Sequence, residues 1–425
     1  MKALLLIFLL LFNYSFSQET VFELLNANQT GVEFNNIIED KKEHNILLYA
    51  NYYGGGGVGI ADFDNDGLQD IYFGGNLVAD KIYRNLGNFK FTDKTLSSGI
   101  NDNGSWSSGI TIADVNNDGL VDVYVSKELY DDKPELRRNK LYINKGDFTF
   151  EESSKKWGVD VSARTRHAVF FDYNNDGHLD LYLLNQPPNP GSYSKFFGSD
   201  LTLPEYSLQL FKNTGNNSFI DVTKEAGLNR TGFPNSVVAS DLNQDGYVDL
   251  YVANDFDAPD FLYYNNGDGT FSYETESSLK HTSFYSMGVD SADINNDGEL
   301  DIMVVDMTAE DNFRLKSNMS GMNPSSFWKV VENGGHFQYM FNSLQINNGD
   351  KTFSDVAQYT KTSSTDWSWA NLIADFDNDG LKDIYVTNGL LRDIRNTDAD
   401  KKVGQFVLKI ADDYVKKNKS FDYNL

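Results

Sequence analysis

The stretch Asp62-Phe63-Asp64-Asn65-Asp66-Gly67-Leu68-Gln69-Asp70 decides how this chain folds. Carboxylate side chains stand at positions one, three, five and nine, with glycine at position six. Alternate residues project to the same side, so several oxygen ligands can converge on one hard cation. Gly67 allows a sharp reversal that a Cβ would hinder. The stretch therefore predicts an acidic loop that binds Ca²⁺.

The same nine-residue pattern occurs five more times, so it marks an internal repeat. The further copies read DVNNDGLVD, DYNNDGHLD, DLNQDGYVD, DINNDGELD and DFDNDGLKD, beginning at Asp114, Asp172, Asp241, Asp293 and Asp375. We number these acidic loops 1 to 6 in chain order. Each lies between two strand-like runs, with alternating apolar residues before it and β-branched or aromatic residues after it.

The predicted ligands are the side chains at positions one, three, five and nine and the backbone carbonyl at position seven. They are Asp62, Asp64, Asp66, Leu68, Asp70, Asp114, Asn116, Asp118, Leu120, Asp122, Asp172, Asn174, Asp176, His178, Asp180, Asp241, Asn243, Asp245, Tyr247, Asp249, Asp293, Asn295, Asp297, Glu299, Asp301, Asp375, Asp377, Asp379, Leu381 and Asp383. About six Ca²⁺ ions are expected, one for each loop, with a mainly structural role.

An EF-hand shares the first half of this pattern but requires a glutamate at position twelve and flanking helices. Position twelve is apolar here in all six copies: Phe73, Val125, Leu183, Val252, Val304 and Val386. The EF-hand interpretation therefore fails.

A second motif of the form Tyr-x-Asn-x-Gly follows five of the six loops. Its copies start at Tyr83, Tyr142, Phe211, Tyr263 and Gln345, and a phenylalanine follows each. Asn-x-Gly is typical of a hairpin turn. Each repeat thus supplies four strands at a period of 52 to 82 residues. This pattern predicts an all-β fold, a β-propeller of six or seven four-stranded blades with calcium loops and short helical insertions.

The two ends of the chain differ from the repeats. Residues 1–17 have a basic start, an apolar run and small residues, which is typical of a secretory signal peptide. Residues 18–395 are expected to form the propeller, with an outer strand supplied from Phe22–Val32. Residues 396–425 carry apolar side chains at helical spacing and predict a helical tail, which we interpret as a truncated continuation of a longer architecture.

Composition narrows the function classes. The chain of 425 residues has 36 basic and 62 acidic residues, a net charge of −26, which disfavours a nucleic-acid partner. It contains no cysteine, so disulfides and thiolate chemistry are excluded. No segment of the mature chain is apolar and long enough for a membrane helix. We expect a protein that is secreted or held at the cell surface, in the periplasm or outside the cell.

The loop Ala61–Gly67 together with the later Tyr-x-Asn-x-Gly resembles FG-GAP/VCBS repeats, known from the propellers of integrin α-chains. Gly54–Gly57 and Thr365–Trp369 are similar to the secreted bacterial branch, which is often paired with ASPIC/UnbV modules. The resemblance implies bound Ca²⁺ and a role in adhesion or ligand binding, with an extracellular protein or glycan as the partner.

The alternative is a carbohydrate-active enzyme, a polysaccharide lyase or hydrolase on a calcium-stabilised propeller. No recognised catalytic motif supports it, and no catalytic residue is assigned. Arg166 and His167 are the best candidates for a basic group in a central channel. Trp106, Phe233, Tyr285 and Trp367 stand eight residues before their loops, where they either meet a ligand at the channel mouth or pack between blades.

Overall fold

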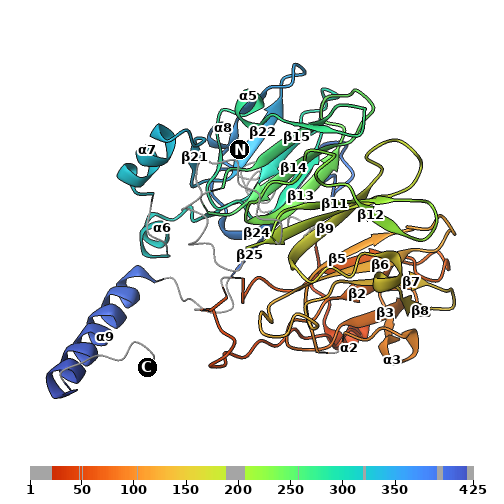
Figure 1. Ribbon diagram of the computed structural model, residues 1–425, viewed down its shortest axis with the longest axis horizontal. Helices are drawn as coiled ribbons and strands as arrows, with labels where there is room; N and C mark the ends of the chain where they lie inside the picture. The colour runs from red at the N-terminus through yellow and green to blue at the C-terminus, as the bar shows by residue number, and fades with distance from the viewer. Residues whose placement is uncertain are drawn as a thin grey trace, which may run out of the picture.

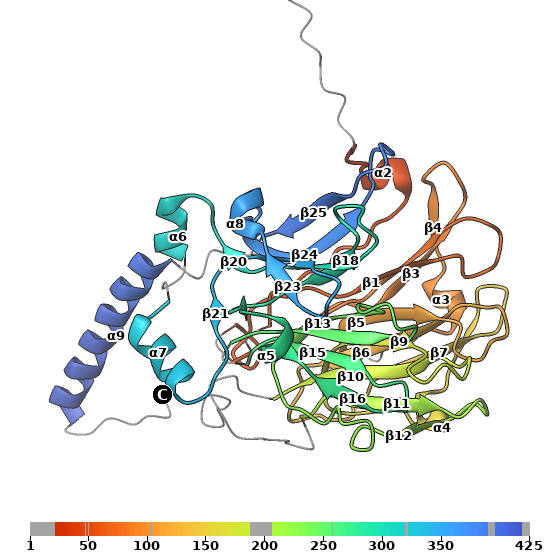
Figure 2. The ribbon, with the colours of Figure 1, turned by 90° about the horizontal axis from the view of Figure 1, so that it is seen from above.

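The computed structural model describes residues 22–418 apart from 47, 50, 103, 188–205, 257, 319–321 and 390–395. These residues form an all-β propeller of six blades (Figures 1 and 2). The expected signal peptide and most of the connection between Gln186 and Gln209 lie outside the described residues.

Five blades have four antiparallel strands each. Blade 1 is β1 (Val58–Ala61), β2 (Asp70–Phe73), β3 (Lys81–Asn85) and β4 (Phe91–Asp93). Blade 2 is β5 (Trp106–Ala113), β6 (Asp122–Glu128), β7 (Lys140–Asn144) and β8 (Phe150–Glu152). Blade 3 is β9 (Arg164–Phe171), β10 (Asp180–Gln186), β11 (Gln209–Asn213) and β12 (Phe219–Asp221).

Blade 4 is β13 (Pro234–Ser240), β14 (Asp249–Asn254), β15 (Phe261–Asn265) and β16 (Phe271–Tyr273). Blade 5 is β18 (Val289–Ala292), β19 (Asp301–Val304), β22 (Ser343–Asn347) and β23 (Phe353–Asp355). Blade 6 has β24 (Asp366–Ala374) and β25 (Asp383–Asn388), with β20 (Met307–Thr308) paired to the start of β24. A small parallel pair joins β17 (Thr282–Ser283) to β21 (Gln338–Tyr339).

The core lies between neighbouring blades, because each sheet buries side chains on both faces. Tyr72 of β2 is fully buried in a cluster that includes Val123, Tyr142 and Phe150 of blade 2. Similar clusters fill each interface from blade 2 to blade 6. Strands buried on both faces explain why the second strands read as continuous apolar runs.

Helices occupy the connections. The one-turn helices α3 (Thr95–Ser98), α4 (Ser154–Trp157), α5 (Thr275–Ser278) and α8 (Ala357–Thr360) each follow a fourth strand. The insertion in blade 5 carries α6 (Asn312–Asn318) and α7 (Pro324–Glu332). The expected C-terminal helix is α9 (Thr397–Asn418), which extends away from the blades near α6 (Figure 2). Among the described helices, none has the length and apolar character needed to cross a bilayer.

The outer strand expected from Phe22–Val32 is not assigned as a strand. Residues 22–26 have no regular structure, and α2 (Ala27–Thr30) follows with a capping box at Asn26. The segment nevertheless lies beside blade 6, since the Phe22 ring is 5.6 Å from the ring of Phe376 and 5.4 Å from that of Tyr385. A strand needs a hydrogen-bonded neighbour, and among the described residues no strand pairs with the outer edge of β25 to provide one.

Candidate calcium loops and ligand-facing cavities

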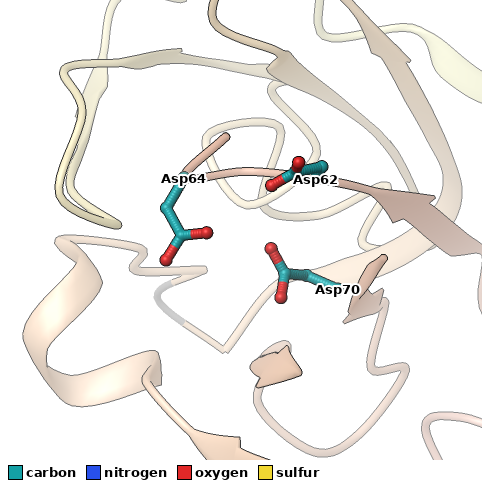
Figure 3. Close-up of side chains that lie close together, drawn as sticks. All are labelled: Asp62, Asp64 and Asp70. Atoms are coloured by element: carbon teal, nitrogen blue, oxygen red, sulfur yellow. The ribbon is translucent and has the colours of Figure 1, made fainter. Parts of the chain in front are cut away.

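Loop 1 connects β1 to β2, and its carboxylates converge as the spacing predicts. One oxygen from each of Asp62, Asp64 and Asp70 lies within 4.8 Å of the others (Figure 3). The backbone N–H groups of Asp66 and Gly67 donate to the two oxygens of Asp62, at 3.0 Å and 2.7 Å. These bonds hold the first carboxylate in place at the mouth of the loop.

All six loops share this backbone geometry. In each one, the N–H groups at positions five and six donate to the aspartate at position one. Asp375, Asp377 and Asp383 of loop 6 also form a close carboxylate group. Loops 2 to 5 have an asparagine at position three, which supplies a neutral oxygen in place of the third carboxylate.

The aspartate at position nine has a second role. Asp122 is buried, and its oxygens accept from the backbone N–H of Val115, at 3.0 Å, and of Asn144 in the third strand, at 2.8 Å. Burial raises the pKa of Asp122 to about 7, against the opposing effect of these two hydrogen bonds. Burial likewise raises the pKa of Asp180 and Asp249 to about 7 and that of Asp70 to about 6.

The residues present fit a divalent cation. Asp64 Oδ1 is buried and has no hydrogen-bond partner among the described residues. Its side chain belongs to the close group formed with Asp62 and Asp70. A buried oxygen without a partner is costly unless an ion occupies its free lone pairs. A cation of charge +2 would also offset the repulsion that clustered carboxylates exert on one another.

The side chains at position seven lie away from the loop. They cover the hairpin glycines: a methyl group added to Gly215 would lie 2.7 Å from the His178 ring, and one added to Gly267 would lie 2.8 Å from the Tyr247 ring. Position seven can therefore offer only its backbone carbonyl to an ion. His178 is not placed to bind metal through its imidazole.

Two basic residues reach into the loops, which the sequence reading did not foresee. Arg84 of β3 contacts Asp64 and pairs with Asp66 at 3.0 Å. Lys212 of β11 pairs with Asp176 at 3.1 Å. Both stand directly before the asparagine of the Tyr-x-Asn-x-Gly motif, and this shared position is the signal that could have identified them.

The asparagine of that motif links neighbouring blades, a role that the turn pattern alone did not indicate. Asn144 accepts from Gly146 N–H within its own hairpin, at 3.0 Å. Its side-chain NH₂ donates to Phe63 O in loop 1, at 2.8 Å, and to Val121 O in loop 2, at 3.1 Å. Asn213, Asn265 and Asn347 repeat the bond to the preceding loop at 2.9, 2.8 and 2.8 Å.

A cavity of about 320 Å³ along the propeller axis is lined by the first strands of blades 2, 3, 4 and 6 and by the residues just before β1 and β18. Arg166 and His167 are on its wall, as expected. Arg166 pairs with buried Glu128 at 3.5 Å, and Arg164 pairs with Asp131. Burial, with a smaller contribution from Arg166, lowers the pKa of His167 to about 4, so this imidazole is neutral near pH 7.

The aromatic residues at the starts of the first strands mostly pack within the protein. Trp106 is fully buried and stacks on Tyr52 at 5.3 Å. Phe233 and Trp367 are also buried, and Tyr285 meets Phe256 edge to face at 6.1 Å. Packing is therefore the interpretation that the structure supports for this set.

A second cavity of about 210 Å³ lies beneath the blade 5 insertion. Its lining is mainly aromatic and aliphatic: Phe284, Tyr285, Met322, Phe327, Val330 and Met340, with Asn323, Ser326, His336 and Gln338 as its polar members. Gln338 is almost fully buried, and its NH₂ group donates to Phe256 O and Ala258 O. Gln338 Oε1 and His336 Nε2 are buried without a partner among the described residues.

These two cavities and the acidic loops lie at different ends of the strands. Each first strand runs into a loop and each second strand starts from it, so the connection from second to third strand lies at the opposite end. The insertion that covers the 210 Å³ cavity is such a connection. The fold thus places the acidic loops at one end of the strands and the two cavities at the other.

Blades that each repeat the same acidic loop and hairpin define a class of repeat propeller. The comparison with family models supports this classification. The model of the FG-GAP-like repeat matches residues 45–125, 131–183, 200–252, 241–304 and 330–386. The chain belongs to this family.

Among curated proteins, cartilage acidic protein 1 of Homo sapiens is 22% identical over 379 residues, which cover 78% of this chain and 56% of that protein. Its Xenopus tropicalis counterpart is 24% identical over 354 residues, covering 78% and 48%. The chain therefore spans about half the length of these relatives. An Agrocybe aegerita lectin specific for non-reducing terminal N-acetylglucosamine is a structural neighbour with 17% identity and a TM-score of 0.43, covering 77% of this chain and 73% of the lectin.

Proposed function

We propose that this chain is a secreted, calcium-loaded propeller that acts as a binding or adhesion module for an extracellular protein or glycan. In this proposal residues 1–17 are a signal peptide, residues 18–395 the propeller and residues 396–425 a helical tail. The observation that carries the proposal is the cavity beneath α7, where an aromatic and methionine lining surrounds two buried polar atoms that have no partner among the described residues. Apolar cavities with a few convergent polar groups are the usual form of a ligand site.

The polar atoms indicate what the ligand must offer. Gln338 Oε1 accepts hydrogen bonds, because its NH₂ is already held by two backbone carbonyls. His336 lines the same cavity, and burial lowers the pKa of this histidine, which favours the neutral ring. A group with both a donor and an acceptor, such as an amide or a hydroxyl, would satisfy the pair, and an apolar neighbour would fill the remaining space.

A screen on a glycan array, together with capture of extracellular proteins in the presence of calcium, tests the proposal. Gln338→Leu and His336→Ala should each weaken the captured interaction at least about tenfold, because a polar partner is lost in a desolvated site. His44→Ala, which removes a histidine outside the cavity, is the matched control. Binding that both cavity variants retain in full would contradict the placement of the ligand.

Calcium loading is tested separately by titration calorimetry on the chelated protein. About six ions should bind with dissociation constants of about 10⁻⁴ to 10⁻³ M, as in other extracellular modules. Asp114→Asn combined with Asp118→Asn should remove one ion and leave the rest. Asp132→Asn, an exposed aspartate outside the loops, should leave the number of ions unchanged.

The enzyme alternative depends on Arg166 and His167 in the axial cavity. A histidine with a pKa of about 4 is a weak proton acceptor near neutral pH, which favours binding over general-base catalysis. Incubation with acidic polysaccharides, with and without His167→Ala, distinguishes the two: turnover that the substitution abolishes would replace the binding proposal with an enzymatic one.

A further inference from the structure

The first strands of four blades share an irregularity near their starts. In β5, β9, β13 and β24 the pairing with the second strand skips one residue, so each of these strands has a β-bulge. The residues that the pairing skips are Ser108, Arg166, Asn235 and Trp369. A bulge re-aims the side chain of its extra residue and is frequent beside functional sites. All four residues line the axial cavity.

These four residues hold one position of the repeat, six residues before the first aspartate of the acidic loop. Blades 1 and 5 have Gly56 and Met287 at this position, and both also line the cavity. The acidic loops repeat the same kinds of residue in every blade, but this position differs in all six. It combines one cationic and two polar side chains with an indole, a thioether and a glycine. Apolar groups with a few polar ones are the usual lining of a ligand site.

The guanidinium of Arg166 is buried, yet its contacts are long. An arginine offers five N–H donors. Among the described residues, Nη2 donates to Gly54 O at 3.4 Å, and Nη1 forms an ion pair with Glu128 at 3.5 Å. Nη1 is buried and makes no hydrogen bond to a described residue. Both distances exceed the usual range for N–H···O bonds, so this guanidinium has donors for a further acceptor.

Arg164, two residues earlier in β9, shows a guanidinium whose donors are used. Its Nε and Nη2 donate to the two carboxylate oxygens of Asp131, with Nε at 2.9 Å. Such a bidentate carboxylate is the strongest kind of partner for an arginine. Arg166 has no bidentate partner within the described residues. A carboxylate that entered the cavity would supply one.

The charge of Arg166 is only partly compensated from within the protein. Glu128 is fully buried and is not part of the cavity lining. Burial raises the pKa of Glu128, which favours its uncharged form. An acceptor that reaches Arg166 through the cavity must therefore come from a ligand, and a negative charge on it is favoured.

Two further polar groups border the cavity beside Arg166. His167 Nδ1 is buried and has no partner among the residues that the structure describes. A neutral imidazole can carry its proton on this nitrogen and donate it to a hydrogen bond. The Ser236 hydroxyl in blade 4 forms no hydrogen bond within the described part of the chain. Both groups can bond to oxygen atoms of a ligand held by Arg166.

The wall across the axis from Arg166 is apolar. The first strands follow one another around the axis in the order β1, β5, β9, β13, β18, β24. Trp369 of blade 6 is therefore three blades away from Arg166 of blade 3. Its indole N–H already donates to Gly389 O at 2.5 Å, so the ring offers the cavity an apolar surface. Met287 of blade 5 adds a thioether, which adapts to varied apolar shapes.

We propose that the axial cavity is a second binding site, in which the guanidinium of Arg166 holds the carboxylate of a small organic acid. His167 and Ser236 add hydrogen bonds, and Trp369 contacts the body of the ligand. A volume of about 320 Å³ suits a ligand built on a single sugar or aromatic ring. The described linings of this cavity and of the one beneath α7 have no residue in common, so the site does not depend on the ligand proposed there.

Titration calorimetry with matched pairs of probes tests the proposal on the full chain in saturating calcium. Galacturonate and phenylacetate carry a carboxylate on a sugar ring and on an aromatic ring. Galacturonate methyl ester and phenylacetamide are their neutral counterparts. At least one acid should bind at least about tenfold more tightly than its counterpart, because only the acid forms the charged fork with Arg166.

The probe that binds identifies the source of the carboxylate. Binding of galacturonate alone would assign the site to acidic sugars, and binding of phenylacetate alone would assign it to aromatic acids. Equal affinity within both pairs, or the absence of binding by either acid, would overturn the proposal. Because the probes are small and bind directly, this failure would leave the cavity beneath α7 as proposed.

Two variants locate the bound acid. Arg166→Gln removes the charge and should weaken binding at least about tenfold. Ser236→Leu fills the cavity from blade 4 while the pair of Arg166 with Glu128 stays intact, so it tests the site if the first variant is unstable. Arg138→Gln, at an exposed arginine that pairs with Asp160, is the control and should bind as the parent does. Parental affinity in a Ser236→Leu protein that keeps the parental melting temperature would contradict the site.

Discussion

The side-chain NH₂ of Asn144 donates to the backbone carbonyl of Phe63 over 2.8 Å and joins the third strand of blade 2 to the acidic loop of blade 1. The same bond recurs at the next three interfaces. The Tyr-x-Asn-x-Gly motif is therefore more than a hairpin turn. It joins the acidic loop of one blade to the third strand of the next blade.

Removing the asparagine bond between two blades should destabilise the fold at Asn144, which makes this bond, but less at Asn85, which lacks it. Asn144→Ala leaves the Phe63 carbonyl buried without a partner, which we expect to lower the free energy of unfolding by about 1–3 kcal/mol. Asn85→Ala is the matched variant, because Asn85 makes the bonds within its own hairpin and loop but lacks the bond between blades. Urea unfolding in saturating calcium measures both, and equal losses would contradict the assigned role.

Arg84 should compete with the ion of loop 1, because its guanidinium contacts Asp64 and Asp66. Arg84→Gln removes a positive charge beside the carboxylates, so the calcium affinity of this loop should rise several-fold. Lys81→Gln removes the same charge from the same strand, where the lysine pairs with Asp93, and serves as the control. Calorimetric titration resolves the change. A lower affinity in Arg84→Gln would mean that Arg84 organises the loop instead.

Asp260 should make stability fall as pH rises. Burial raises its pKa to about 7, and Tyr251 and Ser286 donate to its carboxyl at 2.7 Å and 3.0 Å. An unfolded aspartate has a pKa of about 3.9, so between ~pH 4 and ~pH 7 the folded state binds more protons than the unfolded state. The stability contributed by this group is complete below that window and is lost as pH rises through about 7.

Asp260→Asn should therefore flatten the pH dependence of the unfolding free energy measured by urea between about pH 5 and about pH 8. Asp132→Asn, an exposed position, should leave the slope of the parent protein unchanged. The expectation is wrong if Asp260→Asn and the parent share one pH profile.

Asp80, the counterpart of Asp260 in blade 1, should affect stability through a buried ion pair. Asp80 and Lys127 are both buried, with Lys127 Nζ 3.6 Å from the Asp80 carboxylate. Asp80→Asn leaves an unpaired ammonium in the core and should cost about 3–5 kcal/mol. The double variant Asp80→Leu with Lys127→Met should lose less than the sum of the single changes, because it leaves no buried charge. A double-mutant cycle by urea unfolding provides the coupling energy, and strict additivity would argue against the pair.

Much of the fold could be predicted because each repeat is marked by motifs of a few adjacent residues. The Asp-x-Asp/Asn-x-Asp-Gly loops and the hairpin motif delimit the four strands of blades 1 to 5. The phenylalanine after each hairpin is the first residue of a fourth strand, as at Phe91 and Phe150. Alternation and turn chemistry are properties of a few adjacent residues, so one sequence suffices to read them.

Contacts between blades could not be predicted in the same way. Asn144 and Phe63 are 81 residues apart, and no local pattern shows that they meet. The cavity beneath α7 depends on how the blade 5 insertion folds over Gln338, and the insertion has no counterpart in the other repeats to guide the reading. The sequence predicted short helical insertions in the propeller, but it did not place them here or indicate which side chains they would enclose.

Blades 1 and 6 stand at the two ends of the series of blades, and they should unfold before the blades between them. Among the described residues, blades 2 to 5 each pack against a neighbouring blade on both sides, whereas blades 1 and 6 each pack against one neighbouring blade. Such a chain behaves as a one-dimensional array whose terminal units fray before its interior ones. Amide hydrogen exchange should therefore be slowest in blades 3 and 4 and become faster toward blades 1 and 6.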